Sequence, residues 1–203
     1  MIRRASAVIL LFLLGLILAG CPKRPPVPVP PIEKPAFVNP IDRILEVFSF
    51  AETLQSKASI RIDLVRNEGK EVYILNGLIF FQRPDKLRIL GYHPLGMGIF
   101  DALYRSGEFS LLIPLQKAAF SGEVHQFEDA MRKVGEIRVT SGINEVRNIP
   151  NRIRIEIVEK EIEIEIRLKE TQVNQELSED SFQWTLPEDV KERPLSNLLR
   201  GIK

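Results

Sequence analysis

The chain has 203 residues, with 28 lysines and arginines against 27 acidic residues and a single cysteine. A formal net charge of +1 leaves no basic surplus for binding nucleic acid, so we expect no nucleic-acid partner. A single cysteine also excludes an internal disulfide and a cysteine-rich metal site, so the fold must be stabilised by its hydrophobic core.

The N-terminal segment has the pattern of a secretory signal. Arg3 and Arg4 precede an unbroken apolar run over residues 7–18, and small residues lead up to Gly20 and Cys21. The alternative is an uncleaved transmembrane helix, but the apolar run is shorter than the ~20 residues that a spanning helix needs. We therefore expect cleavage between Gly20 and Cys21 and a mature chain that does not span the bilayer.

The sole cysteine directly follows Leu18-Ala19-Gly20, and this run resembles the lipobox of bacterial lipoproteins. The resemblance implies that residues 1–20 are a lipoprotein signal peptide, that the Cys21 thiol carries a diacylglycerol, and that the new amine is acylated, for example with palmitate. Two or three acyl chains anchor a protein firmly, whereas one binds only marginally. Pro22 takes the place of the aspartate that marks retention at the inner membrane. In a bacterium with two membranes, the resemblance therefore implies a lipid anchor on the periplasmic face of the outer membrane.

Residues 21–40 are expected to be the lipidated cysteine and a Pro-rich tether. Prolines favour an extended polyproline conformation, and here they stand at Pro22, Pro25, Pro26, Pro28, Pro30, Pro31, Pro35 and Pro40. The alternative is a ligand for a Pro-recognising domain. Residues 41–203 remain, which is enough for one domain with a sizeable core.

A helix is expected directly after Asn39 and Pro40, a capping residue followed by a proline at the first helical position. Apolar residues at helical spacing extend this helix from Ile41 through about Leu54. From residue 58 the period changes to two, which predicts strands. The expected strands are 58–64, 72–82, 86–92, 99–105, 108–113 and 118–120, with a hairpin turn at Asn67-Glu68-Gly69. A second helix is expected near 123–134.

The last third of the chain has the most regular alternation. Ile153, Ile155 and Ile157 match the alternating apolar residues of 162–168, while charged residues occupy the other face, which predicts one wet face and one apolar face. Phe182, Trp184 and Leu186 predict a last strand, and residues 195–199 predict a terminal helical turn. This order predicts an α+β fold: an antiparallel β-meander curled into an open half-barrel, with helices covering the concave face.

Three stretches resemble the fold shared by the LolA and LolB proteins of lipoprotein sorting. They are Asn76 to Arg88, with its Arg83-Pro84-Asp85 turn, the run Pro94-Leu95-Gly96, and Phe182 to Pro187. The resemblance implies an apolar cavity that accepts acyl chains or lipoproteins, and a LolA-like periplasmic carrier as a further partner. Within this resemblance, the lipid anchor favours similarity to LolB, which is itself an outer-membrane lipoprotein, over similarity to the soluble LolA.

The same resemblance implies a membrane-transfer loop with an exposed leucine, matched here by Leu95 with Met97 close by. The alternative is that Leu95 folds back into the core. Aromatic residues are the candidates for lining the cavity, with ordinary core as the alternative: Phe48, Phe80, Phe100, Phe109 and Trp184.

The sequence contains little that points to catalysis. His93 and His125 lie outside any metal-binding spacing, and neither a nucleophile elbow nor a phosphate loop is present, so we expect no metal, no cofactor and no enzyme. Glu161, Glu163 and Glu165 share a strand face with basic neighbours, where solvated charge is favoured over a catalytic carboxylate pair. The expected function is an anchored carrier of acyl chains. The alternatives are a non-catalytic anchored envelope scaffold or regulatory module with the same fold and, more weakly, a hydrolase whose residues assemble only in space.

Overall fold

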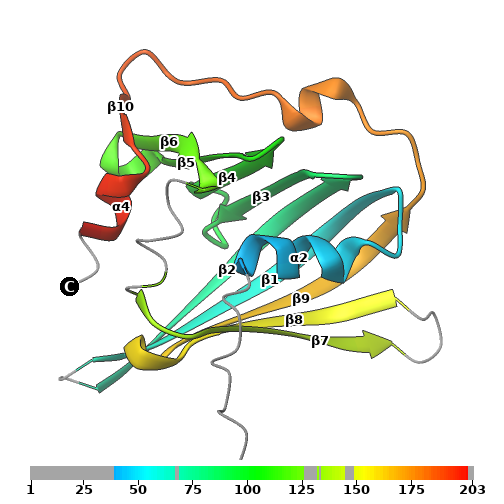
Figure 1. Ribbon diagram of the computed structural model, residues 1–203, viewed down its shortest axis with the longest axis horizontal. Helices are drawn as coiled ribbons and strands as arrows, with labels where there is room; N and C mark the ends of the chain where they lie inside the picture. The colour runs from blue at the N-terminus through cyan, green and yellow to red at the C-terminus, as the bar shows by residue number, and fades with distance from the viewer. Residues whose placement is uncertain (1–38, 67–68, 126–131, 133, 145–148, 201–203) are drawn as a thin grey trace, which may run out of the picture. The chain divides into compact units, whose positions relative to one another are not determined.

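The computed structural model describes residues 39–66, 69–125, 132, 134–144 and 149–200 (Figure 1). They belong to one of the two units into which the chain divides, Phe37–Lys203. The expected signal peptide and nearly all of the expected tether lie outside the described residues. None of the helices within these ranges is long and apolar enough to cross a membrane.

The described residues form ten strands in one sheet and few helical segments. The strands are β1 (Thr53–Arg66), β2 (Gly69–Gln82), β3 (Lys86–Tyr92), β4 (Gly98–Arg105), β5 (Glu108–Ile113), β6 (Ala118–Glu123), β7 (Ile137–Asn144), β8 (Ile149–Ile157), β9 (Ile162–Val173) and β10 (Lys191–Pro194). The helical segments are α2 (Pro40–Phe48), α4 (Ser196–Arg200) and the 3-10 turns η1 (Pro114–Gln116), η2 (Val158–Lys160) and η3 (Glu179–Phe182).

The sheet is open, with the strand order β10-β6-β5-β4-β3-β2-β1-β9-β8-β7. Hairpins account for most neighbours, while the β1–β9 pair brings the beginning and the end of the domain side by side. The prediction of an open β-sheet is confirmed, whereas the coverage of its concave face by helices stays a prediction. The prediction of a wholly antiparallel sheet is wrong, because β10 runs parallel to β6.

Helix α2 packs on one face of the sheet, which we call the inner face. The Asn39 carboxamide oxygen accepts a hydrogen bond from the Ile41 N–H at 3.0 Å, so the expected N-cap is present. The Phe48 ring lies 5.6 Å from the Phe81 ring and is fully buried. The helix ends at Phe48 and does not continue to Leu54, because the chain from Thr53 onward pairs with β2.

The opposite face, which we call the outer face, is partly covered by residues 174–190, the strap. The predicted last strand through Phe182 and Trp184 is wrong: the strap forms η3 and irregular structure along the outer side of β3–β6 (Figure 1). Arg88 fixes it by donating to the Ser181 carbonyl at 3.1 Å. Phe182 and Trp184 alternate because both pack on the sheet, and the strand that pairs with β6 follows only at Lys191.

Two further sequence expectations concern helices. The expected second helix near 123–134 falls mostly on residues outside the described ranges. The terminal helical turn is confirmed as α4, and Leu195 and Leu198 pack on apolar residues of β6 there.

Strand β7, which the sequence analysis did not predict, forms the edge of the sheet beside β8.

Candidate functional site

Apolar side chains predominate on the inner face of every strand that contributes to it, with Ser56 of β1 and Ser141 of β7 among the polar exceptions. Since side chains alternate along a strand, the register places Ile60 beside Leu75 on one neighbour and Ile166 on the other. Beneath α2 this face forms a fully buried core. Beyond α2 its side chains are only half-buried, and these include Ile62, Ile89, Phe100, Leu111, Ile155 and Ile164.

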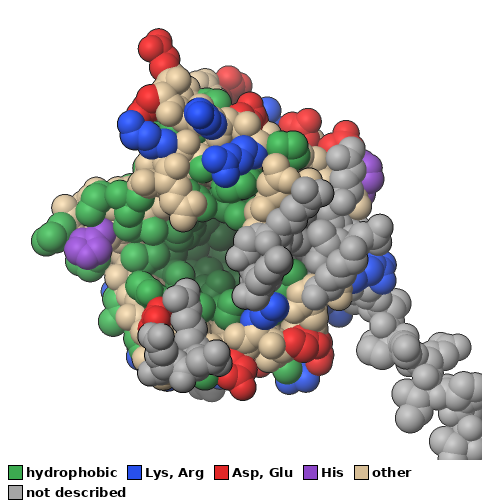
Figure 2. Space-filling model, turned by 90° about the vertical axis from the view of Figure 1, so that its left-hand side faces the viewer, with side chains coloured by type: hydrophobic (Ala, Val, Ile, Leu, Met, Phe, Trp, Pro, Cys, Tyr) green, Lys and Arg blue, Asp and Glu red, His purple; other side chains and the backbone are tan. Residues whose placement is uncertain are grey.

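Figure 2 shows this arrangement as a hollow lined by hydrophobic side chains, with charged side chains around its edge. The hollow is seen from the left-hand side of Figure 1, the end at which the β1–β2 hairpin closes. The register places the β3–β4 and β5–β6 turns at the same end, because Tyr92 pairs with Asn76 and Ile113 pairs with Ala118. Half-buried apolar surface in a concavity is the usual setting for a hydrophobic ligand.

The structure separates the five aromatic residues predicted to line the cavity. Phe48, Phe100 and Phe109 lie on the inner side, where Phe48 belongs to the core and Phe109 packs with the cluster beneath α4. Phe80 lies on the outer face, since its neighbour Phe81 points inward. Trp184 lies in the strap and lines an outer pocket with Leu103. These two therefore do not line the hollow.

The aliphatic residues of the hollow were missed as site candidates. Ile62, Leu111, Ile155 and Ile164 occupy inner-face positions at which the alternation already predicted an apolar side. The two-residue alternation of the sequence therefore already indicated that these aliphatic residues face inward. The aromatic candidates were chosen by residue type alone, without regard to the face on which each lies.

The β3–β4 turn holds Leu95 away from the core. The Gly96 N–H donates to the His93 carbonyl at 2.7 Å, and the His93 N–H donates to the Met97 carbonyl at 2.8 Å. The Leu95 N–H donates to the His93 Nδ1 at 3.2 Å. Leu95 is 87% exposed and Met97 49%, so the alternative in which Leu95 folds back into the core does not describe this turn.

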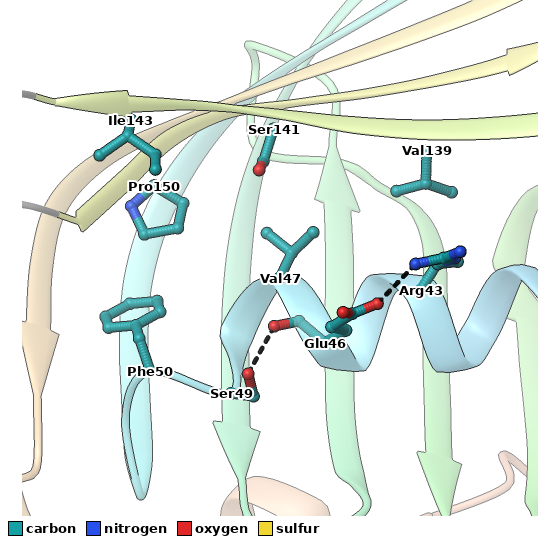
Figure 3. A pocket seen from close by; sticks show the side chains of 9 residues that line it. All are labelled: Arg43, Glu46, Val47, Ser49, Phe50, Val139, Ser141, Ile143 and Pro150. Atoms are coloured by element: carbon teal, nitrogen blue, oxygen red, sulfur yellow. Dashed lines mark hydrogen bonds and ion pairs between the residues drawn. The ribbon is translucent and has the colours of Figure 1, made fainter.

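A groove of about 430 Å³ lies between α2 and strands β7 and β8 (Figure 3). Arg43 and Glu46 form an ion pair of 2.9 Å across its helical side. Its other lining residues are Val47, Ser49, Phe50, Val139, Ser141, Ile143 and Pro150. With charged and hydroxyl groups along one wall, this groove suits a hydrocarbon chain less well than the hollow does.

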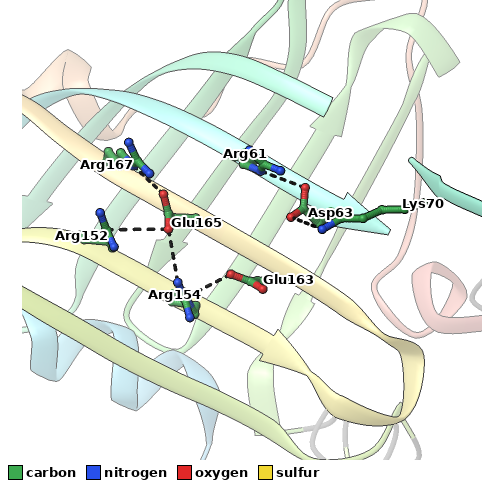
Figure 4. A network of polar contacts seen from close by, with 8 residues as sticks. All are labelled: Arg61, Asp63, Lys70, Arg152, Arg154, Glu163, Glu165 and Arg167. Carbon is green, nitrogen blue, oxygen red and sulfur yellow. Dashed lines mark hydrogen bonds and ion pairs between the residues drawn. The ribbon is translucent and has the colours of Figure 1, made fainter. Parts of the chain in front are cut away.

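The outer face of β1, β8 and β9 carries a network of ion pairs (Figure 4). The Glu165 carboxylate accepts a hydrogen bond from Arg167, and Arg154 and Arg152 lie 3.5 and 3.8 Å away. The hydrogen bond from Arg167, with help from the other two arginines, holds the pKa of Glu165 below its ordinary value. A general acid needs a raised pKa, so Glu165 is unsuited to that role.

This face is also drier than predicted. Glu165 was expected on a solvated surface, yet it is buried among charged neighbours, and so is Asp63. Asp63 accepts from Arg61 at 2.9 Å and pairs with Lys70 at 3.1 Å, and these contacts lower its pKa. The long basic side chains of adjacent strands cover the carboxylates, which a one-strand pattern does not reveal.

The two histidines lie in separate places. His93 accepts the hydrogen bond in the β3–β4 turn, and the His125 Nε2 lies 3.2 Å from Glu123 on the surface. Among the described residues, no group of three or more histidine, cysteine, aspartate or glutamate side chains could hold a metal ion.

Comparisons with known proteins give weak similarities. No protein-family model and no curated protein matches the chain. Among solved structures, it is similar to an uncharacterized conserved protein from Thermus thermophilus, at 9% identity and a TM-score of 0.44 over 77% of this chain and 99% of that one. A LolA superfamily protein from Nitrosomonas europaea gives 9% identity and a TM-score of 0.42 over 71% and 97%. A domain from Vibrio parahaemolyticus, described as an outer membrane lipoprotein-sorting protein domain, gives 8% and 0.39 over 70% and 95%. At TM-scores below 0.5, these similarities do not establish a shared activity.

Proposed function

We propose that this chain is an anchored, non-catalytic carrier that accepts an acyl chain in the inner-face hollow and helps to deliver lipoproteins to the outer membrane. The observation that carries the proposal is that the inner face is largely apolar and yet is only half-buried beyond α2. The anchor at Cys21, the periplasmic side of the outer membrane and a LolA-like donor are parts of the proposal that come from the sequence resemblance.

Hydrophobic burial alone provides a sufficient driving force. Burying about ten methylene groups at ~0.8 kcal/mol each contributes about 8 kcal/mol, which corresponds to a micromolar dissociation constant. Binding of this strength is reversible, so the direction of transfer follows the relative affinities of donor, carrier and membrane. In the proposal, the exposed Leu95 and Met97 contact the receiving membrane.

The test is binding of a fluorescent fatty acid to the chain from residue 21 onward carrying Cys21→Ala. We expect saturable micromolar binding that Leu111→Gln on the inner face weakens about tenfold, because a polar group then faces the ligand. Leu78→Gln is the matched control, since Leu78 is also half-buried but lies on the outer face. Absence of saturable binding, or equal weakening by both substitutions, would contradict the proposal.

A further inference from the structure

Two neighbouring turns carry the most exposed large hydrophobic side chains of the described residues. Leu95, in the β3–β4 turn, is 87% exposed, and Leu115, in η1 of the β5–β6 turn, is 63% exposed. The turns are neighbours because Pro114 lies beside Gly98, where an added Cβ would be 3.8 Å from the proline ring. Two separate segments therefore present leucines at one end of the sheet, the end at which the hollow is seen to open (Figure 2).

Both leucines stand on ordered turns. In η1 the Lys117 N–H donates to the Pro114 carbonyl at 3.0 Å, and the Lys117 ammonium pairs with Asp189 of the strap at 2.9 Å. The Leu95 turn is closed by its own three hydrogen bonds. Exposure is thus a feature of the fold at these two positions, because each backbone is held with its leucine outward.

The chemistry of the two turns fits a lipid bilayer. Neither 93–98 nor 113–117 contains an acidic residue, and the proline before each leucine is exposed as well. Protein-binding surfaces are typically enriched in tyrosine, tryptophan, phenylalanine, methionine and arginine, and of these the two turns contain only Met97. An apolar tip without carboxylates can enter the acyl region at little electrostatic cost, whereas a carboxylate there would be expensive.

We propose that Leu115 inserts into a phospholipid bilayer together with Leu95, so that η1 is a second membrane-contacting turn. This inference rests on the proposed carrier function, for which it assigns the surface that faces the membrane. Insertion of both turns would hold the end of the sheet against the bilayer, with the hollow open toward the lipid. An acyl chain could then leave the hollow without crossing water.

The test uses the full lipidated chain reconstituted in phosphatidylcholine vesicles that contain a lipid-borne quencher. Cys21 is the only native cysteine and is acylated in the proposed function, so Leu95→Cys, Leu115→Cys and Ile143→Cys would each give one free thiol for an environment-sensitive fluorophore. Ile143 is the control because it is 58% exposed but lies at the other end of the sheet, in register with Pro150. The unsubstituted chain controls for labelling at Cys21.

We expect lipid quenching of the probes at positions 95 and 115 and none at 143. We also expect Leu115→Glu to slow delivery of a fluorescent fatty acid to vesicles about tenfold. The reason is that the protein then loses the membrane affinity that burial of one leucine side chain contributes. A probe at 115 that reports water while the probe at 95 is quenched would overturn the inference. So would a probe at 115 that is shielded from water but not quenched, since a second copy or another protein would then cover it. Fatty-acid uptake is measured in parallel: uptake without quenching removes only this inference, and quenching without uptake removes only the carrier function.

Discussion

On β4 and β5, apolar side chains of the outer face are buried more deeply than those of the inner face. On β3–β6 the outward residues Leu103, Leu112 and Ala119 are at most 9% exposed, and the strap runs along this side (Figure 1). The inward neighbour of Leu112, Leu111, is only half-buried. Among the described residues, the C-terminal segment covers apolar surface on the outer side, whereas the inner side around Leu111 is covered less completely. Surface that a protein leaves uncovered in this way is a candidate for binding.

The largest expected effect comes from removing the anchor of the strap. Phe182→Ala is expected to lower the free energy of unfolding by about 3–5 kcal/mol, because Phe182 is a buried phenylalanine packed on the outer face. Denaturant unfolding measures this loss. Phe109→Ala is the matched control: Phe109 is half-buried on the inner side and should lose less. Equal losses of unfolding free energy would mean that the side chains of Phe182 and Phe109 are equally well packed on their two faces of the sheet.

The second effect concerns the ion pair beneath the strap. Arg88 and Asp101 lie 2.7 Å apart with side chains only 16% and 15% exposed, and the carboxylate raises the pKa of Arg88. Asp101→Leu should lower the free energy of unfolding by about 3 kcal/mol, because it leaves the guanidinium desolvated and without its carboxylate.

The control is the double variant Arg88→Met with Asp101→Leu, compared by the same unfolding measurement. It removes both charges and should regain part of the stability. If the double variant were as unstable as the sum of the single changes, the loss would come from packing and not from an unpaired charge.

The alternation of apolar and polar residues predicted the strands of the sheet but not the segments that pack on its faces. Period-two patterns identified the strands around Ile60 and Ile153, because one apolar side chain in two reflects burial on one face. The pattern does not identify the segment that covers the apolar face. Phe182 and Trp184 alternate like a strand although they pack on a sheet without pairing with it. The ion pairs around Glu165 join β8 and β9, so the pattern of β9 alone did not show that this carboxylate is buried.

A smaller effect is expected from the ion-pair network of the outer face. The folded-state pKa of Glu165 lies below its ordinary value of 4.5, chiefly because Arg167 donates a hydrogen bond to the carboxylate. The network therefore contributes stability above about pH 4.5 that is lost as the pH falls through the lower, folded-state pKa. Glu165→Gln should lower the free energy of unfolding by about 1 kcal/mol at pH 7 and by less at pH 3.

Urea unfolding at the two pH values measures this difference. Glu163→Gln is the control, since Glu163 is 39% exposed and its pairing is with Arg154, so its effect should be smaller. A loss at pH 3 as large as that at pH 7 would indicate that the side chain of Glu165 acts through packing and not through its charge.

The smallest effect on stability is expected at the open end of the hollow, where the functional effect should be clear. Leu95 is almost fully exposed, so Leu95→Glu should change the free energy of unfolding by less than about 0.5 kcal/mol. Because the turn lies outside the hollow, fatty-acid uptake should be unchanged while delivery from loaded protein to vesicles slows. Ile143→Glu, a comparable exposed site at the other end of the sheet, should slow neither step. Equal loss of uptake and delivery in Leu95→Glu would mean that this turn forms part of the binding site. Ligand binding by the hollow and membrane contact by the turn would then not be separate functions.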